Sequence, residues 1–110
     1  MLDCGFMKVH GLKELDEFCK KHPVARAWIQ GWLSDAKGAT WTCSHDIRSR
    51  YATVSFLGTN VVIFNVKGND YRMVTRVAYK MGSVVVNWVG THAAYSKINW
   101  EQATNEASGR

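Results

Sequence analysis

Two segments in the first third of the chain carry apolar residues at helical spacing. Residues 12–21, LKELDEFCKK, place leucine, phenylalanine and cysteine three or four positions apart with charged residues between them, which is typical of an amphipathic helix. Proline disfavours helix in the residue before it, so this helix ends at His22-Pro23. A second apolar stripe begins at Pro23, where a first helical turn tolerates proline, and predicts a helix that ends near Lys37-Gly38.

Beyond Ala52 the pattern changes to β-branched and aromatic runs separated by short turns. It predicts four strands, at residues 53–57, 60–66, 70–80 and 83–89. Turns of this length leave no room for crossover helices, so we expect the strands to run antiparallel. The chain is therefore predicted to be an α+β protein, with two N-terminal helices packed on one face of an antiparallel sheet of about four strands.

The segment between these two regions favours a short helix over residues 45–51. Ser44 is a candidate cap for this helix, because its hydroxyl can accept an early backbone N–H. Asp46 suits the positive end of the helix dipole.

The composition indicates one domain, spanning residues 1–110. A hydrophobic content of 46% with five tryptophans suffices for one compact core. The last ten residues, EQATNEASGR, lack an apolar period and are predicted to form a flexible tail at 101–110. The opening sequence has no long apolar run, so we expect neither a secretory signal nor a membrane-spanning helix there, and a cytoplasmic protein.

The cysteines, histidines and glycines form no recognisable cofactor motif. The three cysteines are odd in number and lack CxxC spacing, and the four histidines are dispersed. No glycine-rich, phosphate-binding loop precedes a predicted helix. We therefore expect no metal ion, no disulfide framework and no nucleotide cofactor.

Positive charge is concentrated in the second half of the chain. The net charge is +5, but between Ile47 and Trp100 seven lysines and arginines accompany the single acid Asp70. A polyanion is the natural partner of such a region. A basic surface that only keeps the protein in solution is the alternative.

Several of these cations belong to one face of the predicted sheet. Side chains alternate between the two faces of a strand, and in the third strand this alternation sends Arg72, Arg76 and Lys80 to the same side. The neighbouring strands permit one polar strip on that face, composed of Asn65, Lys67, Arg72, Arg76 and Asn87. The alternative is that the arginines form structural salt bridges with the acids of the helix at 12–21.

The chemistry available to this strip is that of a metal-free ribonuclease. The fourth strand is expected to break at Gly90, and His92, Tyr95 and Lys97 follow it. RNA supplies its own nucleophile, the 2′-hydroxyl, so a protein has only to align it, move protons and neutralise charge on the phosphorane. We assign phosphate binding to Arg72 and Arg76, stabilisation of the nucleophile's developing charge to Lys67, and proton transfer to His92 or Tyr95.

From about Met7 to Trp100 the sequence resembles the HigB toxins of bacterial type II toxin–antitoxin modules, a branch of the RelE-like mRNA interferases. The resemblance rests on FCKKHPVARAWIQGW, FNVKGNDYRMVTRVAY and VGTHAAYSK, in that order. It implies a RelE-like fold, ribosome-dependent cleavage of mRNA, and a hetero-oligomeric complex with a HigA-type helix-turn-helix antitoxin. It also suggests that residues 1–6 are an extension before a native start at Met7.

The resemblance also implies roles for individual residues. Arg72 of GNDYR is the expected phosphate ligand, and His92 and Tyr95 of THAAY match a motif associated with catalysis. Lys67 and Asn65 of FNVKG occupy the strand end where related toxins place basic or polar active-site residues. With the cations of the basic region added, the residues expected to bind RNA are Asn65, Asn69, Arg76, Lys80, Lys97, Arg48 and Arg50. Asn69 is also expected to shape its turn. Family members often have acids on both sides of this tyrosine, whereas Ala94 and Ser96 stand here, which predicts a less acidic site.

Two other functions fit the same residues. One is an RNA- or ribosome-binding module that blocks translation without cleavage, and only a nuclease would leave new 5′-hydroxyl ends in mRNA. The other is a structural role, in which the basic face only holds an acidic antitoxin. In that case expression of the protein alone should be harmless.

Overall fold

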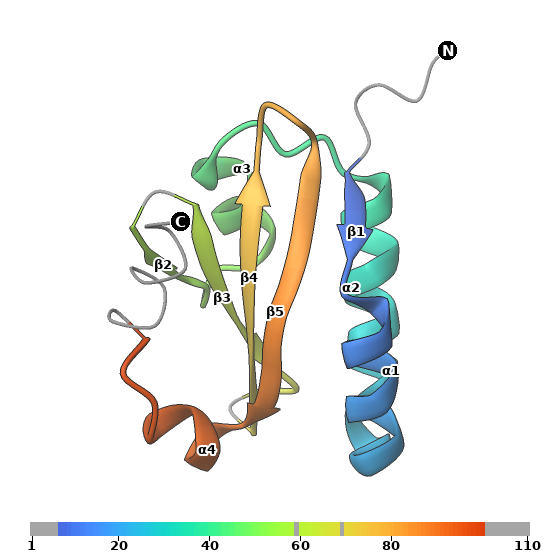
Figure 1. Ribbon diagram of the computed structural model, residues 1–110. Helices are drawn as coiled ribbons and strands as arrows, with labels where there is room; N and C mark the ends of the chain where they lie inside the picture. Colours follow the sequence, from blue (N-terminus) through green and yellow to red (C-terminus); the bar gives the residue numbers. More distant parts are fainter. Residues whose placement is uncertain (1–6, 59, 69, 101–110) are drawn as a thin grey trace.

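The computed structural model describes residues 7–58, 60–68 and 70–100, and Figure 1 shows helices on both sides of one sheet. The helical elements are α1 (Leu12–Lys21), the 3₁₀ turn η1 (Pro23–Ala25), α2 (Arg26–Gly38), α3 (Ser44–Arg50) and α4 (His92–Ser96). The strands are β1 (Lys8–His10), β2 (Ser55–Leu57), β3 (Val61–Val66), β4 (Tyr71–Ala78) and β5 (Ser83–Thr91). The expected extension at 1–6 and the expected tail at 101–110 lie outside the described residues.

The sheet has five strands in the order β1-β5-β4-β3-β2. Strands β2 to β5 form the expected antiparallel meander. The prediction of a four-stranded, wholly antiparallel sheet is wrong, because β1 pairs parallel with β5. Gly11 then turns the chain into α1 with φ 90°, and a Cβ there would lie 2.6 Å from the carbonyl oxygen of Val86. Only glycine suits this close approach in a left-handed conformation.

The two predicted N-terminal helices are confirmed, and Pro23 opens the second through the 3₁₀ turn. The short helix α3 is also present, but the prediction of Ser44 as its cap is wrong. Cys43 is the cap residue, and Ser44 is the first helical residue. The carboxylate of Asp46 accepts hydrogen bonds from the backbone N–H and the hydroxyl of Thr42, both at 2.9 Å. These bonds hold the pKa of Asp46 below its ordinary value.

The main core lies between the sheet and helices α1, α2 and α3. Trp32 is almost fully buried and meets Phe64 edge-on, with ring centres 5.5 Å apart. Leu15 from α1 and Ile47 from α3 pack into the same cluster. Removal of this much apolar surface from water is the principal stabilisation of the fold. In the part of the chain described, no helix is long and apolar enough to cross a membrane.

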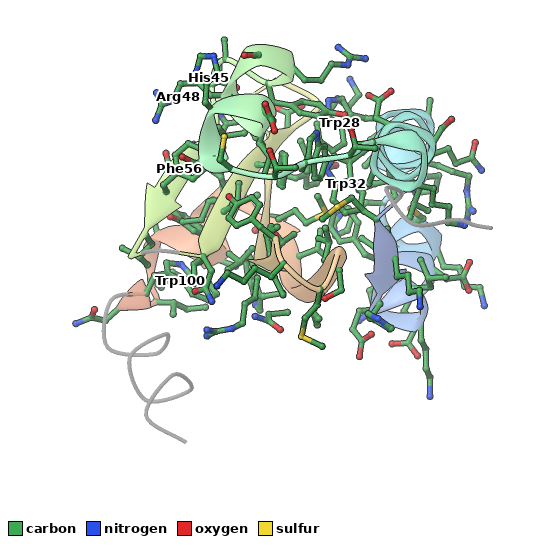
Figure 2. The ribbon with its side chains drawn as sticks, turned by 90° about the horizontal axis from the view of Figure 1, so that it is seen from above. Trp28, Trp32, His45, Arg48, Phe56 and Trp100 are labelled. Carbon is green, nitrogen blue, oxygen red and sulfur yellow. The ribbon has the colours of Figure 1, made fainter. Side chains whose placement is uncertain are left out.

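The second face of the sheet carries a smaller apolar cluster. Its buried residues are Val61, Ile63 and Val74, and the partly buried side chains around them are Leu57, Trp88, Tyr95 and Trp100. Figure 2 shows Trp28 and Trp32 on one side of the sheet and Trp100 on the other. The sheet is therefore covered on both faces, by three helices on the first face and by α4 with Trp100 on the second.

Candidate functional site

Arg72 stands in a cross-strand row at the end of the sheet. Its partners in register are Asn65 on β3 and Gly90 on β5. The side chains of Arg72 and Val74 project to the second face, because Tyr71 and Met73 belong to the main core. Arg76 follows on the same face, opposite Val61 and Val85. The structure therefore brings Asn65, Arg72 and Arg76 onto one face, as the alternation predicts.

The fourth strand departs from the predicted strip. Val74 pairs with Trp88 and Thr75 pairs with Val86, so Asn87 is an extra residue in a β-bulge. The bulge shifts the rest of β5 by one position, and Val89 packs against the main core. The bulge therefore takes Asn87 out of the predicted row: Trp88 stands opposite Val74, and Gly90 stands opposite Arg72.

The prediction that Gly90 breaks the fourth strand is also wrong, because β5 continues to Thr91. A Cβ on Gly90 would lie 2.8 Å from two carbons of the Trp88 ring. The indole of Trp88 thus lies over Gly90, in space that the side chain of any other residue would occupy. A glycine inside a strand is a known signal of such close packing.

Arg72 and Tyr95 are in contact, although they belong to different elements. The guanidinium carbon of Arg72 lies 5.7 Å from the centre of the Tyr95 ring, within the range of a cation–π interaction. Tyr95 in turn stacks on Trp100, with ring centres 5.4 Å apart and planes 21° apart. The indole N–H of Trp100 donates to the Tyr95 carbonyl oxygen at 3.0 Å. Sequence reasoning missed Trp100, because it follows the last predicted element and carries no periodic signal.

Lys67 and His92 belong to the same end of the sheet. Lys67 lies in the turn between β3 and β4 with φ 51°, and its side chain is exposed. The backbone carbonyl of Asp70, from the same turn, accepts a hydrogen bond from the His92 backbone N–H at 3.0 Å. This bond ties the turn to the start of α4, where Thr91 caps the helix by accepting the N–H of Ala94. His92 is the first residue of that helix and is exposed.

The other residues expected to bind RNA are more scattered. Lys97 follows α4 and is exposed, whereas Lys80 lies beyond the opposite end of β4 from Arg72. Arg48 lies over the ring of Phe56 at 4.9 Å, and Arg50 forms an ion pair with Asp35 at 2.9 Å. Both arginines come from α3, on the first face of the sheet (Figure 2). Asn69 lies outside the described residues.

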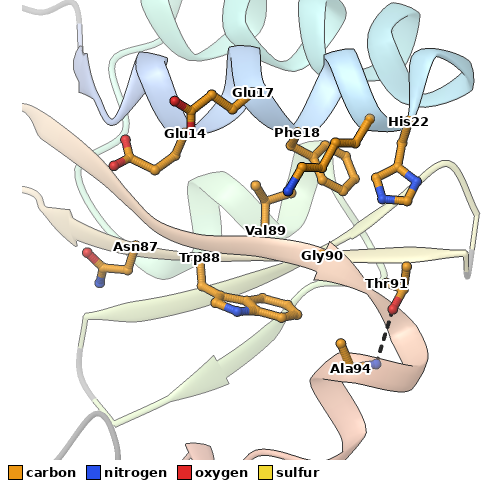
Figure 3. Close-up of a pocket in the computed structure, with 11 residues that line it drawn as sticks. Glu14, Glu17, Phe18, His22, Asn87, Trp88, Val89, Gly90, Thr91 and Ala94 are labelled. Carbon is orange, nitrogen blue, oxygen red and sulfur yellow. Dashed lines mark hydrogen bonds between the residues drawn. The ribbon is translucent and has the colours of Figure 1, made fainter.

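A groove runs between α1 and β5, on the other side of β5 from β4. It encloses ≈ 460 Å³ and is lined by Glu14, Glu17, Phe18, Lys21, His22, Ala94 and the β5 residues Asn87 to Thr91 (Figure 3). Its lining includes none of Arg72, Lys67 and His92. Asp16 pairs with Lys20 of the same helix at 3.3 Å.

The histidines, cysteines and acids suggest no metal centre. Among the described residues, no three of these side chains are grouped so that they can hold a metal ion. The cations and aromatic rings at the end of the sheet are instead suited to an anionic ligand that carries planar groups.

A comparison with known protein families gives a match. A family model described as HigB toxin, the RelE-like toxic component of a toxin–antitoxin system, matches residues 25–98, more than half of the chain. This match confirms the family resemblance noted in the sequence. A search of the curated proteins found no match.

Proposed function

Because the chain belongs to the HigB toxin family of RelE-like toxic components of toxin–antitoxin systems, we propose that it is a ribosome-dependent endoribonuclease that cleaves mRNA. The observation that carries this proposal is the placement of Arg72 against Tyr95, at the end of the sheet where α4 begins with His92. A cation from β4, together with a phenol and an imidazole from α4, supplies the groups that phosphodiester cleavage needs.

The proposed reaction needs no metal ion. The 2′-oxygen attacks the adjacent phosphorus while its proton passes to a base, and the bond from phosphorus to the 5′-oxygen breaks as that oxygen gains a proton. The products are a 2′,3′-cyclic phosphate and a 5′-hydroxyl end. Arg72 binds the phosphate oxygens as charge builds on them, and Lys67 stabilises the nucleophile's developing charge. His92 and Tyr95 donate and accept the protons.

The remaining basic and polar residues extend the binding surface for mRNA. Arg76 and Asn65 share the face of Arg72, and Lys97 follows α4. We assign contacts with more distant phosphates, on mRNA or on the ribosome, to Lys80, Arg48 and Arg50, and we keep Asn69 as a further residue proposed to bind RNA. Such contacts strengthen binding without reading sequence.

The family membership implies an antitoxin partner. We propose a HigA-type helix-turn-helix antitoxin that neutralises the toxin in a hetero-oligomer. The proposed substrate places the activity in the cytoplasm, where ribosomes translate mRNA.

A binding module that blocks translation without cleavage is the second candidate. The aromatic cluster beside Arg72 favours this candidate. Trp88, Tyr95 and Trp100 offer rings on which bases can stack, and stacking contributes strongly to the binding of single-stranded nucleic acid.

Mapping of mRNA 5′ ends after induction decides between the two candidates. The nuclease produces new 5′-hydroxyl ends within coding regions, and Arg72→Ala abolishes both these ends and growth inhibition while the antitoxin still binds. Arg48→Ala is the comparison variant, because it also removes an arginine that lies over an aromatic ring; it should bind mRNA more weakly through loss of its proposed phosphate contact, but the new 5′-hydroxyl ends should still form. Growth arrest without new 5′ ends would support the binding module. Full toxicity of Arg72→Ala would show that the mechanism does not need Arg72.

A further inference from the structure

The outer edge of β5 is open along half of its length. β1 pairs only with Ser83 to Val85, and Gly11 then turns the chain away against Val86. Helix α1 continues alongside the lower part of β5 (Figure 1). In the described part of the chain, β5 from Asn87 to Thr91 therefore has a strand on one side only, which is β4.

The hydrogen-bonding groups at this edge follow from the register. In an antiparallel pair, residues alternate between two kinds. The backbone N–H and C=O groups of one kind bond to the partner strand, and those of the other kind point away from it. His92 donates its N–H to Asp70, so Thr91, which stands opposite Tyr71, is a residue that points away. The same alternation applies to Val89. The backbone N–H and C=O groups of Val89 and Thr91 thus face α1, and an open edge of this kind is a template for a further strand.

The residues that line the groove between α1 and β5 indicate which kind of ligand this edge can bind. Glu14 and Glu17 line the end near Asn87, and His22 lines the end near Thr91 (Figure 3). The lining also contains one cation, Lys21, so the carboxylates outnumber it by two to one. Two carboxylates disfavour RNA here, although the protein as a whole is basic. An extended polypeptide can satisfy the edge, and a cationic side chain on it would complement the two carboxylates.

We propose that the groove receives an extended segment of the antitoxin, which adds a strand to β5 and places a lysine or arginine against Glu14 and Glu17. This inference rests on the proposed toxin function. β-strand addition is a general mode of peptide recognition, in which main-chain hydrogen bonds supply affinity and side-chain pockets supply specificity. A second copy of this chain fits less well, because its own β5 edge is flanked by its own α1. The segment would contact Ala94 on α4 and leave the Arg72 face uncovered.

Hydrogen exchange in the toxin–antitoxin complex tests the added strand. The background is the full chain with Arg72→Ala, so that the free toxin can be produced, and the probe is the antitoxin encoded beside it. Exchange of the Val89 and Thr91 amides should slow at least about tenfold on complex formation, because both N–H groups become hydrogen-bonded. Unchanged exchange at both amides overturns the proposal. Protection that appears without antitoxin and grows with toxin concentration assigns the edge to a second copy and also overturns it.

Charge reversal tests the acidic end of the groove. Glu17→Lys should weaken antitoxin binding about tenfold or more, since it places like charges together. Asp16→Lys changes the same charge on the same helix, but Asp16 pairs with Lys20 and does not line the groove, so binding should change little. Equal effects of the two variants contradict the proposal.

Two substitutions at Thr91 test whether its backbone N–H, which points away from β4, binds the antitoxin. Thr91→Pro and Thr91→Ala both remove the cap of α4, but only proline removes the N–H, and the φ of −73° at Thr91 suits proline. Antitoxin should bind the proline variant at least about tenfold more weakly than the alanine variant. Equal affinity contradicts the added strand. Cleavage of mRNA by Glu17→Lys, measured in the chain with Arg72 intact, separates this result from the proposed function, because loss of antitoxin binding should leave cleavage unchanged.

Discussion

The guanidinium carbon of Arg72 on β4 lies 5.7 Å from the centre of the Tyr95 ring on α4. The ring is fixed by its stacking on Trp100 and by its contact with Trp88, whose ring centre is 6.2 Å away. An exposed cation–π contact contributes about 0.5–1 kcal/mol. This stabilisation is small, but the contact fixes where the charge stands relative to the phenol. Tyr95 therefore has two separable features, a ring that positions Arg72 and a hydroxyl that can transfer a proton.

Tyr95→Phe separates these two features. Phenylalanine keeps the ring beside Arg72 and Trp100 but lacks the hydroxyl. If the hydroxyl transfers a proton, cleavage should fall by about 10²–10⁴-fold, while thermal stability stays close to that of the wild type. Single-turnover cleavage of mRNA on ribosomes measures the effect. Full activity of Tyr95→Phe together with loss in Tyr95→Ala would leave only the positioning role.

Arg72→Lys should not rescue the activity, although it keeps the positive charge. Lysine cannot bind two phosphate oxygens in parallel, and it stacks less well on an aromatic ring. We expect a loss of about 10²–10³-fold in the cleavage rate, as for the removal of one preorganised donor. Arg48→Lys, at the ring of Phe56 on β2, is the comparison variant; it keeps the positive charge that its proposed contact with a distant phosphate needs, so its cleavage rate should stay close to that of the wild type. Activity of Arg72→Lys close to that of the wild type would contradict bidentate binding.

Gly90→Ala should destabilise the protein by about 1–3 kcal/mol, because the new methyl group would overlap the Trp88 ring, with only 2.8 Å between the Cβ atom and the nearest ring carbons. Gly31→Ala in α2 is the matched control. No neighbouring atom lies within 4 Å there, so the gain in helix propensity should stabilise by about 0.5–1 kcal/mol. Urea unfolding followed by tryptophan fluorescence measures both changes. Recovery of stability in Gly90→Ala with Trp88→Leu would confirm the overlap, and an unchanged Gly90→Ala would exclude it.

The elements predicted correctly are those with a local signal. Helix 12–21 has its own apolar stripe, and the meander from β2 to β5 follows from β-branched runs and short turns. Strand β1 has only three residues and no alternating pattern. Its pairing with Ser83 to Val85 depends on the distant β5 edge and on the space that Gly11 provides. A contact of that kind cannot be predicted from local periodicity.

The site could be predicted only as far as strict alternation holds. Asn65 and Arg72 are in register, as the pattern on β3 and β4 predicts. The bulge in β5 breaks the alternation, so the neighbour of Arg72 on that strand is Gly90, and Asn87 lies outside the row. The position of a β-bulge depends on both paired strands and on the side chains packed around them. It leaves little trace in the sequence of either strand, beyond the glycine over which Trp88 lies.

The contact of Tyr51 with Asp35 predicts loss of stability at alkaline pH. The Tyr51 hydroxyl donates to Asp35 at 2.5 Å, and burial, together with this hydrogen bond, raises the pKa of Tyr51 above its ordinary value. In the unfolded chain a tyrosine has a pKa of about 10. Between these two pKa values the folded protein holds a proton that the unfolded chain has lost. Stability from this group is therefore fully present below about pH 10 and falls as the pH rises further.

Tyr51→Phe should make the unfolding free energy less dependent on pH above about 10, since the variant has no phenol to titrate at this position. At neutral pH the same variant should lose about 0.5–1.5 kcal/mol with the hydrogen bond to Asp35. Tyr79→Phe is the control, because burial also raises the pKa of Tyr79, whereas its hydroxyl is buried without a hydrogen-bond partner among the described residues. That variant should lose no stability at neutral pH. Urea unfolding from about pH 7 to about pH 11 measures these slopes, and an alkaline slope of Tyr51→Phe equal to that of the wild type would show that Tyr51 does not cause the loss.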